Sequence, residues 1–78
     1  MTVLKVGMSG PNVRDLQDML NLKSPLQPLL VVDGIFGPKT RHRVVKFQTL
    51  AKLAPDGIVG PLTGNALVAA VLRNLSKT

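Results

Sequence analysis

The sequence predicts an all-α fold, a compact three-helix bundle in one domain spanning residues 1–78, with its core between 4 and 75. Two observations lead to this prediction. Proline fits the first position of a helix, where its missing N–H would be unpaired anyway, and three Gly-Pro pairs each precede apolar residues at helical spacing. These pairs are Gly10-Pro11, Gly37-Pro38 and Gly60-Pro61. In addition, the pattern D-G-I-x-G-P-x-T occurs twice, at 33–40 and at 56–63, so two helices are expected to begin in the same way.

The first helix is expected to follow Pro11 and to end near Asn21. Its apolar stripe consists of Val13, Leu16, Met19 and Leu20. The next segment contains two prolines within 23–32, which disfavour a helix. We therefore expect a loop there, with a short extended stretch at 29–32.

The second and third helices follow the repeated pattern. After Pro38, one helical face carries Thr40, Val44, Phe47 and Ala51. After Pro61, apolar residues fill most positions, so the sequence predicts that this last helix is the most buried of the three and that 76–78 fray.

Each copy of the repeat has the residues of a turn that leads into a helix. The aspartate is expected to accept a hydrogen bond from the backbone N–H two residues on, and the next glycine to adopt a positive φ. The isoleucine is expected to point inward, and the threonine to lie in the first helical turn, where its hydroxyl can pair with backbone groups. Gln17 and Gln48 either pair with these turns or contact a ligand.

The residues after the first copy are strongly basic. Within nine residues they include Lys39, Arg41, His42, Arg43 and Lys46. Cations near a helix N-terminus oppose its dipole, at a cost of about 0.3–1 kcal/mol each, and violated local rules tend to mark functional sites. The cluster is therefore either a binding site or a solvated face of a basic protein.

The composition narrows the class of partner. Ten Lys and Arg against four Asp give a net charge of +6, which favours an anionic partner. The two phenylalanines are the only aromatic residues of the Phe, Trp and Tyr class, which leaves little for stacking on bases or sugars. No stretch is long and apolar enough to span a membrane, and no signal peptide is evident.

Titratable groups are too few for a catalytic or metal site. The chain contains one histidine, four aspartates, and no cysteine or glutamate. A zinc site needs three or four ligands, and His42 beside two arginines is typical of a surface residue. We therefore expect no catalytic residue, no metal and no cofactor.

The motifs together resemble the bacterial peptidoglycan-binding domain family. The resemblance rests on G-x-x-G-x-x-V-x-x-L-Q-x-x-L within 4–20, on the pair Phe47-Gln48, and on the doubled D-G-x-x-G-x-x-T. It covers about 4–75 and implies a three-helix, non-catalytic module that anchors wall hydrolases such as phage endolysins or amidases. A basic nucleic-acid-binding domain is the alternative.

The resemblance also implies a partner and a location, and the first turn with the basic start of the second helix is the expected site. The partner would be peptidoglycan, not nucleic acid or membrane, and the domain would act at the cell wall or periplasm as a monomer fused to a catalytic domain. The residues expected to bind it are Asp33, Gly34, Phe36, Gly37, Thr40, Arg41 and Arg43. Phe36 either covers an apolar patch of the ligand or belongs to the core.

Overall fold

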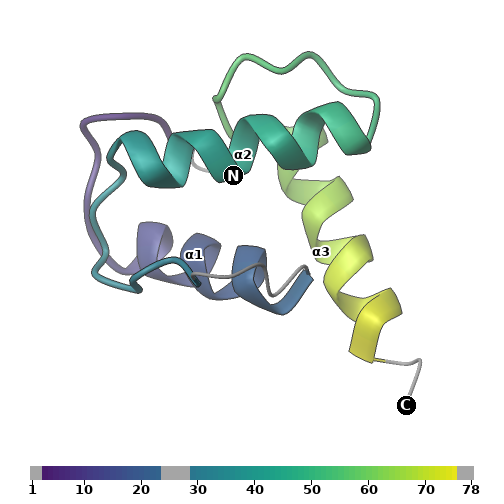
Figure 1. Cartoon of the computed structure of the whole chain (residues 1–78), viewed down its shortest axis with the longest axis horizontal. Helices are drawn as coiled ribbons and strands as arrows, with labels where there is room; N and C mark the ends of the chain where they lie inside the picture. The colour runs from purple at the N-terminus through teal and green to yellow at the C-terminus, as the bar shows by residue number, and fades with distance from the viewer. Residues whose placement is uncertain (1–2, 24–28, 76–78) are drawn as a thin grey trace.

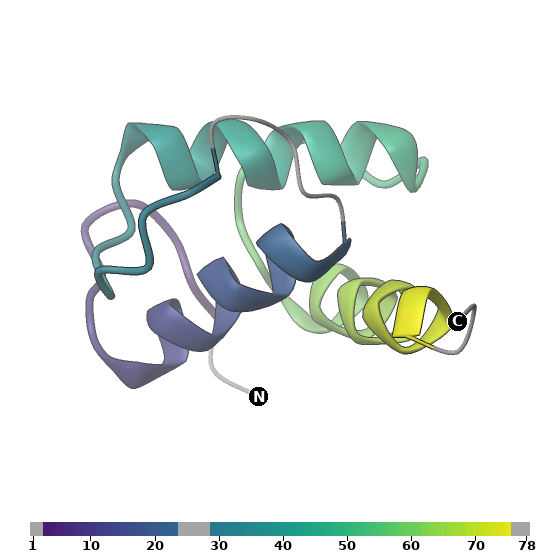
Figure 2. The same ribbon diagram turned by 60° about the horizontal axis from the view of Figure 1, so that its bottom comes forward.

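The computed structural model describes residues 3–23 and 29–75, and over these it contains three helices and no β-strand. The helices are α1 (Pro11–Lys23), α2 (Pro38–Leu50) and α3 (Pro61–Leu75). α1 and α2 run side by side in the same direction, while α3 crosses them steeply and packs against α1 (Figures 1 and 2). The predicted all-α, three-helix architecture is confirmed, and each helix begins at its predicted proline.

The helix ends follow local backbone chemistry. α1 continues two residues beyond the predicted end at Asn21. At the start of α2, Gly37 is extended, with φ −106° and ψ −169°, and Pro38 takes the first helical position. At its end, Lys52 adopts a left-handed φ of 60°, and the N–H of Leu53 donates a 2.8 Å bond back to the carbonyl of Gln48. This 6→1 bond is typical of a helix end closed by a left-handed residue.

The N-terminal segment connects the two repeated turns. Leu4 and Val59 exchange backbone hydrogen bonds of 3.1 and 2.8 Å. Three residues after Leu4, Gly7 donates to the carbonyl of Phe36 at 3.1 Å, and Phe36 donates to that of Met8 at 2.9 Å. One short stretch of chain therefore pairs with both turns and fixes their separation.

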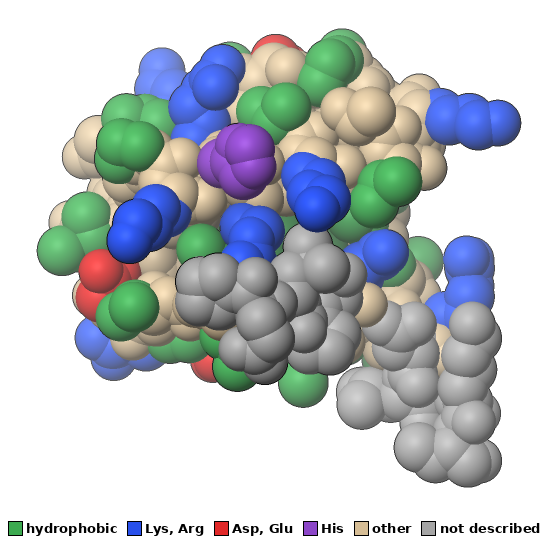
Figure 3. All heavy atoms as spheres, in the orientation of Figure 1, with side chains coloured by type: hydrophobic (Ala, Val, Ile, Leu, Met, Phe, Trp, Pro, Cys, Tyr) green, Lys and Arg blue, Asp and Glu red, His purple; other side chains and the backbone are tan. Residues whose placement is uncertain are grey.

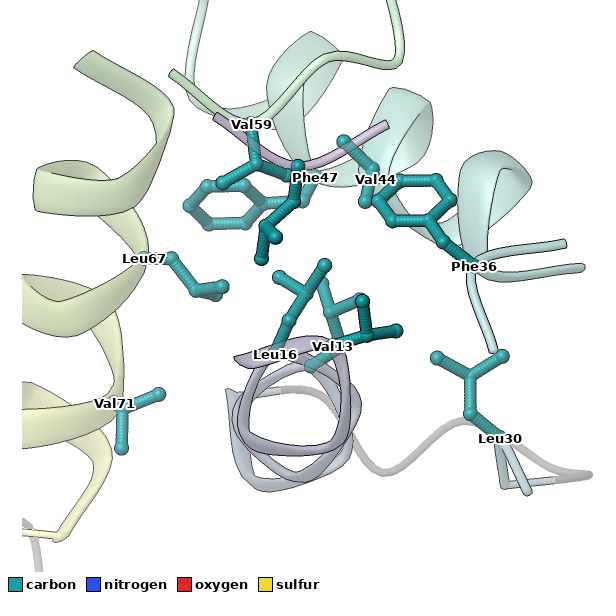
Figure 4. Close-up of a cluster of buried hydrophobic side chains, with 11 residues drawn as sticks. Val13, Leu16, Leu30, Phe36, Val44, Phe47, Val59, Leu67 and Val71 are labelled. Carbon is teal, nitrogen blue, oxygen red and sulfur yellow. The ribbon is translucent and has the colours of Figure 1, made fainter. Parts of the chain in front are cut away.

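The hydrophobic core lies where the three helices and the two turns meet (Figure 4). Leu16 from α1 points toward Phe47 of α2 and Leu67 of α3, and Leu67 is completely buried. The core residues are Leu4, Val13, Leu16, Leu20, Leu30, Phe36, Val44, Phe47, Val59, Leu67 and Val71. Because the turns contribute Phe36 and Val59, the same packing that holds the helices also holds the turns.

The prediction that the two isoleucines of the repeat point inward is wrong. Ile35 is 58 % exposed and Ile58 is 39 % exposed, whereas the following residues, Phe36 and Val59, are 1 % and 5 % exposed. Successive side chains of extended backbone point to opposite sides. Because Phe36 and Val59 enter the core, the isoleucines before them face outward.

The prediction that the last helix is the most buried is also wrong. Leu62, Val68 and Leu72 of α3 are all exposed, and a single stripe of this helix faces the core. No helix within 3–23 or 29–75 is both long and apolar enough to cross a membrane. The segment 29–32 has neither helix nor strand, and the expected fraying of 76–78 lies outside the described residues.

Candidate ligand-binding pocket

Hydrogen bonds from the side chain of Gln17 connect α1 to the first turn. Its Nε2 group donates to Asp33 Oδ1 at 3.0 Å, to the carbonyl of Ile35 at 3.0 Å and to Thr40 Oγ1 at 3.1 Å, so two hydrogens serve three acceptors. Its Oε1 accepts from the N–H of Gly34 at 2.9 Å. Of the two roles considered for Gln17, pairing with the turn is confirmed, because both ends of its buried amide are engaged there.

Asp33 is held as a carboxylate by the same turn. The N–H of Ile35 donates to Asp33 Oδ1 at 2.9 Å, as the Asx-turn prediction requires, and Gly34 has the predicted positive φ of 77°. These hydrogen bonds, first from Ile35 and then from Gln17, with a smaller contribution from the charge of Arg14, lower the pKa of Asp33 below its ordinary value of 3.8. The bonds from Ile35 and Gln17 both reach Oδ1, and neither uses Oδ2.

The second turn repeats this network. Gln48 Nε2 donates to Asp56 Oδ1 at 3.0 Å, to the carbonyl of Ile58 at 3.0 Å and to Thr63 Oγ1 at 3.1 Å. Its Oε1 accepts from the N–H of Gly57 at 2.9 Å. The two turns are therefore built alike, each around a buried glutamine from the preceding helix.

Asn21 positions the segment that approaches the first turn. Its side-chain amide donates to the carbonyl of Leu30 and accepts from the N–H of Leu30, both at 3.0 Å. This reciprocal pair mimics a step of a β-ladder and orients the neighbouring side chains. Leu30 itself is buried, whereas Leu29 and Val31 on either side of it are exposed.

A pocket of about 780 Å³ lies between this segment, the first turn and the start of α2. We call it the Asp33 pocket. It is lined by Gln17, Leu29, Leu30, Val31, Asp33, Ile35, Gly37, Pro38, Lys39, Thr40, His42 and Arg43. Its size suits a ligand of several residues or a small molecule, and ligand sites commonly combine apolar walls with a few placed polar groups.

The polar side of the Asp33 pocket comes mainly from one face of α2. Lys39, His42 and Arg43 are spaced i, i+3 and i+4, which brings them to neighbouring positions on a helix surface. Figure 3 shows Lys and Arg side chains gathered around the histidine on this side of the molecule. The pocket thus contains basic groups from α2, a carboxylate from the turn, and an apolar surface from Leu29–Val31 and Ile35.

Four of the seven predicted site residues line the Asp33 pocket and three do not. Those that line it are Asp33, Gly37, Thr40 and Arg43. Gly34 is buried within the turn, and its N–H donates to the side-chain oxygen of Gln17. Phe36 is a core residue with 1 % of its surface exposed, so its ring is not available to a ligand.

Arg41 belongs to the second turn. A Cβ atom added to Gly57 would lie 2.8 Å from Arg41 Nε and 2.9 Å from its Cγ, so the arginine side chain lies directly over that glycine. The charge of Arg41 also helps lower the pKa of Asp56 below 3.8, after the hydrogen bonds from Ile58 and Gln48. The structure does not bring Arg41 to the Asp33 pocket.

Several lining residues are not among the seven predicted site residues, although Lys39 and His42 belong to the basic cluster. Lys39 and His42 could have been found from helical spacing, because they share a face with Arg43 whereas Arg41 does not. No sequence pattern indicated Leu29 and Val31, because their position depends on the two hydrogen bonds between Asn21 and Leu30. Among the described residues no group of three or more His, Asp, Cys or Glu side chains could hold a metal ion.

A second, smaller hollow of about 340 Å³ lies between α1 and α3. Its lining is mostly apolar and includes Leu16, Met19, Leu67 and Val68, with Asp15 as its charged residue. It shares no residue with the Asp33 pocket and has no basic group, so an anionic ligand is better matched by the Asp33 pocket.

Comparison with known proteins agrees with the motifs of the repeat. A family model described as "Putative peptidoglycan binding domain" matches residues 9–67, which is more than half of the chain. The chain belongs to the peptidoglycan-binding domain family. The match includes both turns, both glutamines and the Asp33 pocket.

The relatives of this peptidoglycan-binding domain include wall hydrolases. It is 44 % identical to a probable N-acetylmuramoyl-L-alanine amidase of Bacillus licheniformis, over 87 % of this chain and 19 % of the amidase. It is 42 % identical to the zinc D-Ala-D-Ala carboxypeptidase of Streptomyces albus G, over 82 % of this chain and 25 % of that enzyme. The chain therefore spans only a fifth to a quarter of these enzymes.

A solved structure confirms the fold of the domain. The crystal structure of the SleB N-terminal domain superposes with a TM-score of 0.82 at 34 % identity, covering 90 % of this chain and 93 % of that one. The superposition includes nearly the whole of both chains, and thus the three helices and the two turns.

Proposed function

We propose that this domain binds bacterial peptidoglycan in the Asp33 pocket without cleaving it, and holds an attached wall hydrolase close to its substrate. The observation that carries the proposal is the pocket itself, a 780 Å³ hollow in which Lys39, His42 and Arg43 lie beside an apolar surface. The presence of an attached enzyme is supported by a relative, an amidase in which the matching region forms about a fifth of the chain.

The chemistry of the pocket favours the stem peptide over the glycan as the part that is bound. Sugar rings are commonly bound by stacking on aromatic side chains, but Phe36 and Phe47 are both buried in the core. Stem peptides carry carboxylates and short aliphatic side chains. The ammonium of Lys39 and the guanidinium of Arg43 can form charge-assisted bonds with such carboxylates, while Leu29 and Val31 can contact the aliphatic groups.

The nucleic-acid alternative has no support from the comparisons, and within the described residues the structure offers no exposed phenylalanine for stacking on single strands. Single-stranded nucleic acids are bound largely by aromatic stacking, and the two phenylalanines are buried. The first turn, which forms a wall of the pocket in the peptidoglycan proposal, would have no role in groove binding. We accordingly propose that the domain acts at the bacterial cell wall, as a monomer beside an attached catalytic domain.

Cosedimentation with purified peptidoglycan sacculi tests the proposal. Charge-assisted bonds contribute about 1.5–3 kcal/mol each, so Lys39→Ala and Arg43→Ala should each weaken binding about tenfold or more. Arg41→Ala is the matched control, because it removes a guanidinium from the same helix but outside the pocket, and it should bind like the parent domain.

Three results would contradict the proposal. One is retention of the domain by DNA cellulose but not by sacculi at the same salt concentration. Another is release of soluble muropeptides from labelled peptidoglycan by the domain alone, which would show catalysis. The third is an equal loss of binding in Arg41→Ala and Arg43→Ala, which would place binding outside the Asp33 pocket.

A further inference from the structure

We propose that the Asp33 pocket selects stem peptides with a free zwitterionic end, in which one carbon carries both an ammonium and a carboxylate. Such an end occurs in peptidoglycan whose third stem residue is an uncrosslinked, unamidated diaminopimelate. This inference rests on the proposed function and specifies which peptidoglycan the site takes.

The first argument is that the pocket presents both signs of charge. Lys39, His42 and Arg43 line it from α2, and Asp33 lines it from the turn. Asp33 and the start of α2 are close together, because Asp33 Oδ1 and Thr40 Oγ1 both lie within hydrogen-bond distance of the same nitrogen of Gln17. A ligand that carries both charges can pair with both sides of the pocket, whereas a ligand with a single charge pairs with only one side.

The second argument is that Asp33 retains capacity for a ligand. Its bonds from Ile35 and Gln17 both reach Oδ1, and they hold it in the ionised form. Oδ2 accepts none of the described bonds. An ammonium placed beside Oδ2 would gain a charge-assisted bond without breaking the turn.

The third argument comes from the second turn, which shows what the fold itself requires. Gln48, Asp56 and Thr63 reproduce the bonds of the first turn. Yet where α2 carries Lys39, His42 and Arg43, the equivalent positions of α3, 23 residues later, carry Leu62, Asn65 and Ala66. The turn therefore forms without a basic face on its helix, so the turn itself does not require Lys39, His42 and Arg43.

The apolar part of the pocket fits the rest of such a ligand. The zwitterionic end of diaminopimelate is joined to the peptide by methylene groups, and the pocket offers Leu29, Val31 and Ile35, all exposed. A stem lysine would supply the methylene groups and the ammonium but no carboxylate. An amidated diaminopimelate would likewise lose the anionic group that the basic face of α2 binds.

Titration calorimetry with four soluble disaccharide tetrapeptides tests the selectivity. Their third residue is meso-diaminopimelate, its carboxamide, its N-acetylated form, or L-lysine. The free diaminopimelate should bind most tightly, and each of the other three about tenfold or more weakly, since each lacks one charge-assisted contact.

Two matched variants test the role of Asp33. Asn retains an acceptor oxygen for the turn, so Asp33→Asn and Asp56→Asn change the two turns in the same way. Asp33→Asn should abolish the preference for the free amine over its N-acetylated form while keeping the preference for carboxylate over carboxamide. Asp56→Asn should retain both preferences.

The outcomes separate this inference from the proposed function. Binding of all four peptides within twofold of one another would overturn the zwitterion inference and leave peptidoglycan binding intact. Equal loss of amine preference in Asp33→Asn and Asp56→Asn would also overturn it. Failure of all four peptides and of intact sacculi to bind would overturn the proposed function itself.

Discussion

Gln17 donates a 3.0 Å hydrogen bond from the middle of α1 to Asp33, which lies 16 residues further along the chain. This contact joins a helix that belongs to the core with a turn that borders the Asp33 pocket. Because the same amide nitrogen also reaches Thr40 in the first turn of α2, one side chain sets the geometry of the pocket. Gln48 has the same role in the second turn, which contributes no residue to that pocket.

Replacing either glutamine by leucine should destabilise the domain to a similar extent. Leucine is close in size but leaves the buried N–H of Gly34 or of Gly57 without a partner. An unsatisfied buried group costs about 1–3 kcal/mol. Urea unfolding followed by circular dichroism should show losses of this size for both Gln17→Leu and Gln48→Leu.

The same pair of variants should differ in binding. Measured under conditions in which both variants are folded, Gln17→Leu should bind sacculi more weakly, since its turn forms a wall of the Asp33 pocket, and Gln48→Leu should bind like the parent domain. If the two variants lose binding in proportion to their loss of stability, Gln17 has no special part in shaping the pocket.

The stability of the domain should fall in acid because of Asp33 and Asp56. The pKa of each is below its ordinary value of 3.8 in the folded state, through hydrogen bonds from the turn. A lowered folded-state pKa means that the unfolded state binds protons first as the pH falls. The contribution is therefore complete above the unfolded-state pKa and is lost as the pH drops through the folded-state value.

Urea unfolding between pH 6 and pH 2 measures this dependence. The free energy of unfolding should change little down to about pH 5 and decline below about pH 4. In the double variant Asp33→Asn, Asp56→Asn the decline should become shallower, because the carboxyls that remain from the four aspartates are those of α1. An unchanged slope in that variant would show that the two turn aspartates do not cause the acid sensitivity.

Gly57 and Arg41 should be energetically coupled. Alanine at Gly57 would have to adopt a φ of 75°, which costs about 1–2 kcal/mol for a residue with a Cβ. Its Cβ would also meet Arg41 Nε at 2.8 Å, so the arginine must move. In a double-mutant cycle, Gly57→Ala should therefore be less damaging when Arg41 is already alanine. Additive losses would show that Arg41 moves aside without cost.

Much of the fold could be predicted from the sequence because it depends on local chemistry. Proline fixes the start of each helix, and aspartate with glycine specifies each turn, so the helix starts and the Asx-turns are confirmed. The inward residue of each turn was mispredicted because Ile35 and Phe36 are both apolar, and the choice between them is made by pairing with Met8 and Gly7.

The candidate site was harder to predict because it depends on contacts between distant residues. Arg41 and Arg43 are two positions apart and carry the same charge, yet one covers Gly57 and the other lines the Asp33 pocket. The composition of α3 was misleading for a related reason. Leu62 and Leu72 resemble core residues in sequence, but α3 contacts the rest of the described chain along a single stripe and leaves both exposed.

Replacing Lys52 by glycine should stabilise the domain. Lys52 is the one non-glycine residue with positive φ in 3–23 and 29–75, and its φ of 60° closes the end of α2. Left-handed backbone costs about 1–2 kcal/mol for a residue with a Cβ, while glycine adopts it freely but loses more conformational entropy on folding. The net gain should be about 0.5–1 kcal/mol in urea unfolding. Lys52→Ala is the control, since it removes the same charge but retains a Cβ, and it should leave the free energy of unfolding nearly unchanged. If both variants gain equally, relief of charge repulsion in this basic domain explains the effect, and strain at Lys52 does not.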